Sequence, residues 1–132
     1  MTVMRTRIVH LSIERPWTEV YAYASDPVRM PEWAAGLAEG LTPNGQIWVA
    51  SGPLGEVRVR FAEPNEYGVI DHTVTLPDGT EVYNALRVTP NGDGAEIAFT
   101  VLRTPGMNDA DFERDAAAVL ADLLTLKKIL EG

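Results

Sequence analysis

The end of the chain, residues 108–131, carries the longest helical pattern in the sequence and constrains the rest of the fold most strongly. Apolar residues recur there at spacings of three and four, which places them on one face of a helix. The stripe consists of Phe112, Ala116, Val119, Leu123, Leu126 and Leu130, with Leu120 and Leu124 widening it. Asn108 suits the N-cap position, and Lys127 and Lys128 lie in the last turn, where the helix dipole favours cations. A rod of about 36 Å with one apolar face must lie against a partner of similar size.

Between residues 37 and 103, short segments alternate with turn-forming residues, and this pattern predicts strands. The turn signals are Pro43-Asn44-Gly45, Gly52-Pro53-Leu54-Gly55, Pro64-Asn65, Pro77-Asp78-Gly79 and Asn91-Gly92. The predicted strands are 37–42, 46–51, 56–63, 67–76, 80–89 and 95–103. An alternating segment, 3–13, adds a first strand, so we expect seven strands that tight turns make antiparallel. The long helix is then expected to cover the apolar face of this sheet.

Two short helices are predicted between the first and second strands. Pro16 suits the first position of a helix, and apolar residues follow at helical spacing through Ala24. Pro27 begins a second helix, which Pro31 interrupts because the residue before a proline avoids the helical region. The predicted architecture is a single α+β domain over residues 1–132.

Two turns predict how the strands pair. Pro77-Asp78-Gly79 suits a three-residue loop, which sets His72 opposite Asn84. Asn91-Gly92 is the signal of a type I′ hairpin, which would set Asn84 opposite Phe99. Both registers place the same set of residues on the apolar face of the sheet.

His72 and Asn84 are the exception on that face, because both are polar. Phe99 and Val59 are expected to flank them in the same row, while the position of Trp48 depends on the turn at 52–55 and stays open. One interpretation is a core histidine that Asn84 satisfies, since buried polar groups normally find partners. The other is a histidine that faces a pocket as a general acid or base or as a ligand-orienting group.

Composition excludes several classes of function. The chain has no cysteine, which excludes disulfides, thiolate catalysis and cysteine-type zinc sites. A net charge of −8 argues against a nucleic-acid partner or an anionic membrane surface. No apolar run is long enough to span a bilayer, and no secretory leader is recognisable, so we expect a cytoplasmic protein. His10 and His72 are predicted on opposite faces, and no phosphate- or dinucleotide-binding motif occurs, so neither metal nor cofactor is expected.

The N-terminal sequence resembles that of a known superfamily. Residues 13–27, IERPWTEVYAYASDP, followed by Met30-Pro31-Glu32-Trp33, are similar to the N-terminal signature of the START-like or SRPBCC superfamily. Its members include polyketide cyclase/dehydrase-like proteins, plant pathogenesis-related ligand carriers and lipid-transfer domains. The resemblance covers the whole chain and implies the helix-grip fold, in which a curved seven-stranded antiparallel sheet wraps around a long C-terminal helix. It also implies a deep cavity between the sheet and that helix.

Three functions follow as hypotheses. The leading one is binding of a small hydrophobic or amphipathic molecule, such as a lipid, a polyketide or an aromatic, in that cavity. The second is an enzyme of cyclase or dehydratase type, with His72 as acid or base and Asn84 orienting it. The third is a protein-interaction module with a closed cavity. A homodimer is the candidate assembly only because such assemblies are common.

The predicted ligand-binding residues combine the polar pair with apolar side chains expected around the cavity. They are His72, Asn84, Phe99, Val59, Trp33, Trp48, Tyr21, Val119 and Leu123. For the aromatic residues Trp33, Trp48 and Tyr21, the alternative is ordinary core packing.

Overall fold

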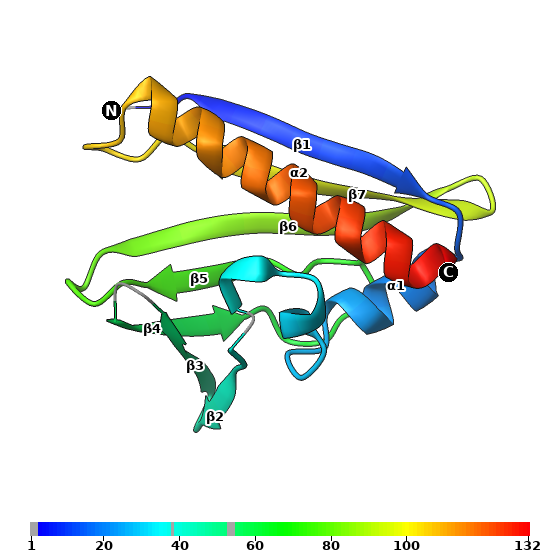
Figure 1. The fold of residues 1–132 in the computed structure, drawn as a ribbon. Helices are drawn as coiled ribbons and strands as arrows, with labels where there is room; N and C mark the ends of the chain where they lie inside the picture. The colour runs from blue at the N-terminus through cyan, green and yellow to red at the C-terminus, as the bar shows by residue number, and fades with distance from the viewer. Residues whose placement is uncertain (1–2, 38, 53–54) are drawn as a thin grey trace.

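The computed structural model describes residues 3–37, 39–52 and 55–132. The strands are β1 (Thr6–Ile13), β2 (Thr42–Asn44), β3 (Ile47–Gly52), β4 (Gly55–Phe61), β5 (His72–Thr75), β6 (Glu81–Asn91) and β7 (Gly94–Leu102). The helices are α1 (Trp17–Ala24), the 3₁₀ turns η1 (Met30–Glu32) and η2 (Ala35–Leu37), and the long α2 (Asp109–Glu131). This order agrees with the predicted one (Figure 1).

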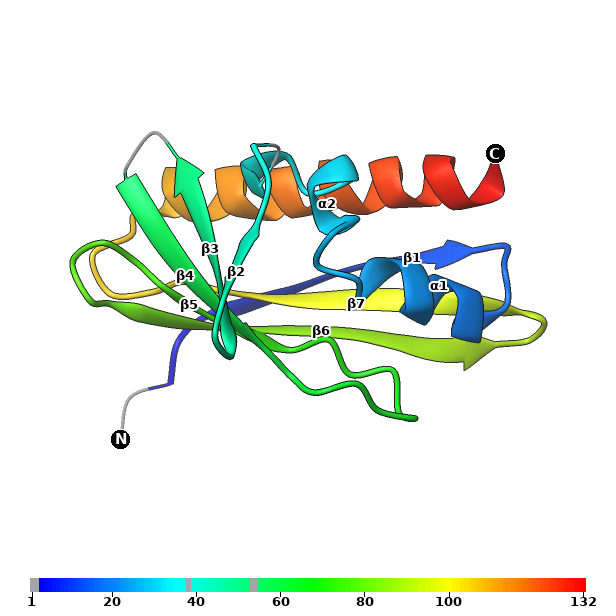
Figure 2. The same cartoon turned by 90° about the horizontal axis from the view of Figure 1, so that it is seen from below.

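The strands form one antiparallel sheet in the order β1-β7-β6-β5-β4-β3-β2. Figure 2 shows β2, β3 and β4 turning up from the level of β1, β7 and β6 towards α2, so the sheet curves around the helix. The short helix α1 lies near the C-terminal end of α2 in both views (Figures 1 and 2). The predicted α+β helix-grip fold is therefore confirmed. None of the helices in the described part of the chain is long and apolar enough to cross a bilayer.

Two of the predicted strands were wrong in extent. The segment predicted as strand 37–42 holds the end of η2, and β2 covers only Thr42–Asn44; residue 38 lies outside the described residues. The predicted strand 67–76 is reduced to β5. Its first half is irregular, because the side chain of Asn65 accepts hydrogen bonds from the backbone of Tyr67 and Val69. Single backbone hydrogen bonds still join this segment to β6, including that from the Ile70 N–H to the Leu86 carbonyl.

The hairpin between β5 and β6 has the predicted register, with His72 opposite Asn84. The loop closes as expected, since Gly79 takes a φ of +89° and its N–H donates to the Leu76 carbonyl at 2.9 Å. The side chain of Asp78 accepts the Thr80 N–H at 2.9 Å. Local turn chemistry was therefore sufficient to place the polar pair side by side.

The hairpin between β6 and β7 departs from the predicted register by two residues. Asn91 pairs with Gly94, so the loop is Gly92-Asp93, and Phe99 lies opposite Leu86 rather than Asn84. Gly92 has a φ of +57° and Asp93 has no positive φ, which is the pattern of a type II′ turn. A shift of two residues leaves every side chain on its predicted face.

The helix α2 packs through its apolar stripe and begins where predicted. Asn108 accepts the backbone N–H of Asp111 at 2.7 Å in a capping box. The stripe is narrower than predicted, because Leu120 and Leu124 are 41% and 50% exposed. The fully buried positions are Phe112, Ala116, Leu123 and Leu126.

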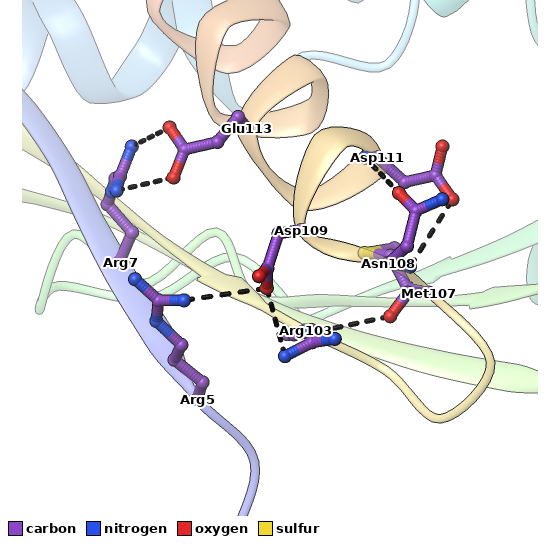
Figure 3. Close-up of polar contacts among 8 residues, drawn as sticks. All are labelled: Arg5, Arg7, Arg103, Met107, Asn108, Asp109, Asp111 and Glu113. Atoms are coloured by element: carbon purple, nitrogen blue, oxygen red, sulfur yellow. Dashed lines mark hydrogen bonds and ion pairs between the residues drawn. The ribbon is translucent and has the colours of Figure 1, made fainter.

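Arginines from the sheet hold the N-terminal end of α2 (Figure 3). Arg7 of β1 forms two hydrogen bonds with Glu113, and Arg103, just after β7, contacts Asp109 at 3.0 Å. The guanidinium of Arg7 also lies 5.7 Å from the centroid of the Phe112 ring. Exposed ion pairs contribute little each, so we expect this cluster to orient the helix end while Phe112 supplies most of the stability.

Candidate ligand-binding cavity

A cavity of about 230 Å³ lies between the curved sheet and α2. Its lining is mostly apolar, with few polar side chains, as is usual for small-molecule sites. The segment from η1 to η2 supplies Met30, Trp33, Ala34, Gly36 and Leu37; the sheet supplies Val57, Val59, His72, Val74, Asn84, Leu86 and Phe99; α2 supplies Val119, Asp122 and Leu123. Its volume lies below the range of roughly 300–1,000 Å³ that is usual for ligand pockets, so it suits a compact molecule.

All but two of the predicted ligand-binding residues line this cavity. The exceptions, Trp48 and Tyr21, lie around a separate hollow beside Phe61. Gly52 pairs with Gly55, and this register sets Trp48 opposite Val59; residues 53 and 54 lie outside the described part of the chain. Trp48 therefore shares the face of Val59 but lies one strand nearer the sheet edge. The Tyr21 hydroxyl accepts the Asn65 N–H at 2.9 Å, which ties Tyr21 to a loop rather than to the cavity.

His72 lies at the centre of the sheet wall. The residue directly opposite His72 on β4 is Phe61 rather than the predicted Val59. The ring centroids of Phe61 and His72 are 5.5 Å apart. The rings of Phe99 and His72 pack edge to face, with their centroids 6.1 Å apart. Nδ1 of His72 lies 3.0 Å from the Ile70 carbonyl oxygen, and Nε2 lies 3.4 Å from Nδ2 of Asn84. The predicted contact between the two polar residues is thus present, and it is long for a hydrogen bond.

The surroundings of His72 favour its neutral form. Burial lowers the pKa of His72 below its ordinary value of 6.5, although the hydrogen bond to the Ile70 carbonyl and the charge of Asp71 oppose the shift. Because a carbonyl oxygen can only accept, the proton of the neutral ring is on Nδ1. The lone pair is then on Nε2, beside the Asn84 amide.

We expect this burial to make folding stability pH-dependent. With a depressed native pKa, the unfolded chain binds the proton more readily, so the free energy of unfolding should fall as the pH drops below about 6.5. Urea unfolding at about pH 7.5 and about pH 5.5 measures the decline. His72→Phe keeps the bulk, should leave the fold intact, and should decline less over this interval. An equal decline in both proteins would place His72 in a solvent-like environment and contradict the argument.

Asp71 is adjacent in sequence to His72 but does not form a dyad with it. It is 4% exposed and accepts hydrogen bonds from the Tyr83 hydroxyl at 2.5 Å, the Leu86 N–H at 3.0 Å and Arg87 Nη2 at 3.0 Å. Burial alone would raise the pKa of Asp71, but these donors outweigh burial and hold the pKa below its ordinary value. The absence of a dyad follows from strand geometry, because successive side chains point to opposite faces.

Asp122 is a polar residue of the cavity that was not among the predicted ligand-binding residues. Its Oδ1 accepts the backbone N–H of Ala35 at 3.2 Å, which connects α2 to η2 across the cavity wall. Burial raises the pKa of the Asp122 carboxyl, and the Ala35 hydrogen bond opposes the shift. A signal was present, because Asp122 lies three residues after Val119 and four before Leu126, on the apolar stripe itself.

The site offers hydrogen bonding and acid–base groups rather than metal chemistry. Among residues 3–37, 39–52 and 55–132, no three His, Cys, Asp or Glu side chains are grouped to hold a metal ion. The cavity wall includes the polar side chains of His72, Asn84 and Asp122 and the indole ring of Trp33, whose buried Nε1–H has no hydrogen-bond partner within the described part of the chain. A neutral imidazole can accept a proton or a hydrogen bond at Nε2, so the arrangement is compatible with ligand orientation and with general-base chemistry.

Comparison with known proteins adds evidence at the level of the fold. No family model and no curated protein matches this sequence. Solved structures that resemble it include DynU16 of the dynemicin biosynthetic locus, with a TM-score of 0.74, 18% identity, and coverage of 96% of this chain and 47% of DynU16. CalU16 from Micromonospora echinospora has a TM-score of 0.71 and 15% identity, over 98% of this chain and 76% of CalU16. Protein CV1439 from Chromobacterium violaceum has a TM-score of 0.71 and 20% identity, over 96% and 97% of the two chains.

Coverage differs among these structures. The chain spans about half the length of DynU16 but almost all of CV1439. Identities of this size establish a common fold and nothing finer. These structures share with this chain an α+β fold in which an antiparallel sheet is packed against a long C-terminal helix.

Proposed function

We propose that this protein is a member of the START-like or SRPBCC superfamily and binds a small hydrophobic or amphipathic molecule between its sheet and α2. The observation that carries the proposal is the cavity of about 230 Å³, mostly apolar, with His72, Asn84 and Asp122 in its wall. Apolar walls provide affinity and a few polar groups provide orientation. The volume favours a compact aromatic or small polyketide-like ring system over a long acyl chain.

Two features support binding over the other two hypotheses. A protein-interaction module can have its interior filled, whereas free space lies between the sheet and α2 of this chain. In an enzyme of cyclase or dehydratase type, a carboxylate would commonly orient the catalytic histidine through its second nitrogen. Here Nδ1 of His72 instead meets a backbone carbonyl. Acid–base catalysis by His72 is therefore the second candidate function.

Native mass spectrometry of the freshly purified protein tests the proposal directly. We expect a fraction of the molecules to carry an additional small mass, and we expect 2-naphthol to displace it. If only the bare chain is observed, and calorimetric titration with 2-naphthol and with decanoic acid gives no binding, the proposal is wrong.

The same measurement separates a carrier from an enzyme. In a carrier, the wild-type protein and His72→Phe hold a bound molecule of the same mass. In a dehydratase that uses His72, the variant retains the substrate while the wild-type protein expels water from it, so the bound masses differ. A cyclisation conserves mass, so for a cyclase the released molecules are compared by chromatography, where the two proteins should give different compounds.

A further inference from the structure

One pair of residues in the sheet exchanges only half of its expected hydrogen bonds. The N–H of Ile70 donates to the Leu86 carbonyl at 2.8 Å, and such an antiparallel pair normally also makes the reciprocal bond from Leu86 to Ile70. Instead, the Leu86 N–H donates to Oδ1 of Asp71 at 3.0 Å. The Ile70 carbonyl accepts from Nδ1 of His72 at 3.0 Å. The side chain of Asp71 thus bonds the donor of the missing ladder bond, and the side chain of His72 bonds its acceptor.

This exchange gives Asp71 a role in the cavity that it does not itself line. We propose that Asp71 is a positioning residue: by accepting the Leu86 N–H, it leaves the Ile70 carbonyl to hold His72 in the Nδ1–H tautomer. The cavity wall then presents Nε2 as a hydrogen-bond acceptor and selects ligands that carry a hydroxyl donor. The selectivity rests on the proposed ligand-binding function, whereas the tautomer belongs to the free protein.

Asp71 is well suited to this task because it cannot easily rearrange. Its other oxygen is held by the Tyr83 hydroxyl at 2.5 Å and by Nη2 of Arg87 at 3.0 Å. Tyr83 and Arg87 are exposed and lie on the outer face of the sheet, away from the cavity. These donors keep the carboxylate ionised at neutral pH, so Asp71 remains an acceptor for Leu86.

The chemistry of the wall indicates the polar group of the ligand. The contact between Nδ2 of Asn84 and Nε2 of His72 is 3.4 Å, longer than the usual 2.9–3.0 Å for a hydrogen bond from an amide, so it is easily exchanged. A ligand hydroxyl can donate to Nε2 and accept from the Asn84 amide at once, which an ether or carbonyl oxygen cannot do. A carboxylate ligand would meet the Nε2 lone pair and the Asp122 side chain. We therefore assign an alcohol or phenol as the preferred ligand class.

The ring nitrogens of His72, observed by ¹⁵N NMR at neutral pH, test the tautomer. We expect a protonated Nδ1 and an unprotonated Nε2 in the wild-type protein. In Asp71→Ala, we expect the Leu86 N–H to return to the Ile70 carbonyl and to weaken the hydrogen bond from Nδ1–H by competing for that oxygen, so the Nε2–H form should become populated. Asp71→Asn retains an oxygen for Leu86 and should restore the wild-type pattern. Glu81→Gln, the control, changes an exposed carboxylate elsewhere on β6 and should leave the nitrogens unchanged.

Two results would overturn the role of Asp71. The first is a protonated Nε2 in the wild-type protein, and the second is a folded Asp71→Ala variant with unchanged ring nitrogens. If Asp71→Ala does not fold, scalar coupling across hydrogen bonds in the wild-type protein decides the question. Coupling from the Leu86 amide to the Asp71 carboxyl carbon supports the proposal, and coupling to the Ile70 carbonyl carbon contradicts it.

Calorimetry with 2-naphthol and 2-methoxynaphthalene tests the ligand class, because methylation removes the hydroxyl donor while keeping the ring system and the oxygen. A methyl group that is merely too large would leave the affinity ratio unchanged in Asp71→Ala. We expect 2-naphthol to bind about tenfold more tightly, and this ratio to fall towards one in Asp71→Ala. Equal binding of the two probes to the wild-type protein would overturn the selectivity. If neither probe binds, the proposed function fails, while the NMR result still decides the role of Asp71.

Discussion

Phe112→Ala is expected to lower the free energy of unfolding by about 3–5 kcal/mol, the largest stability effect that we predict for a single substitution. The Phe112 ring is 1% exposed and packs into the main core at the start of α2. Its removal leaves a void and also removes the aromatic face against which Arg5 and Arg7 lie, at 5.5 and 5.7 Å. Urea denaturation followed by circular dichroism measures the change.

The matched control for this substitution is Leu124→Ala on the same helix. Leu124 is 50% exposed, so its truncation should change the free energy of unfolding by about 0.5 kcal/mol or less. Similar losses for Phe112→Ala and Leu124→Ala would mean that α2 does not pack against the sheet through its predicted stripe.

Val119→Trp is expected to weaken binding of 2-naphthol about 100-fold while the protein remains folded. Val119 lies on the face of α2 that lines the cavity, and an indole ring there would occupy much of the space of about 230 Å³. A bound aromatic would lose the burial of one ring, which corresponds to roughly 3 kcal/mol. Isothermal titration calorimetry measures the loss.

Leu120→Trp provides the control for ring size and helix position. Leu120 follows Val119 directly but is 41% exposed on the outer side of α2, so a tryptophan there should leave the affinity unchanged. Unchanged affinity in Val119→Trp, or equal losses in both variants, would show that the ligand binds outside this cavity.

Features that depend on interactions between residues close in the chain could be predicted from the sequence. The spacing of apolar residues and the cap at Asn108 predicted α2, because helix period and capping act within a few residues. The three-residue loop closed by Gly79 predicted the pairing of His72 with Asn84, because turn geometry sets the register of the strands that it joins. Strand alternation then placed both residues on the inner face.

Tertiary structure decided what depends on curvature and on contacts between distant segments. The sequence left the face of Trp48 open, and the observed register of β3 with β4 sets Trp48 opposite Val59. Trp48 nevertheless lies around a separate hollow, because the position of the cavity wall is set by how far the sheet curls around α2. The predicted and observed registers of the hairpin at Gly92 place the same residues on each face of the sheet, so strand alternation does not distinguish them. In the observed register Gly94 lies beside β1, where a Cβ atom would be 2.7 Å from the Ile13 carbonyl oxygen.

The hydrogen bonds by which Asp71 and His72 replace a ladder bond also depend on tertiary structure. They arise at the start of β5, where the side chains of Asp71 and His72 bond the two groups of a missing ladder hydrogen bond. Strand alternation alone assigns Asp71 and His72 to opposite faces and predicts no connection between them. Sequence pattern reports which face a side chain takes, because that is set by its own backbone. Which groups meet across a cavity or through the sheet is set by the packing of elements far apart in the chain, and only the folded structure contains that information.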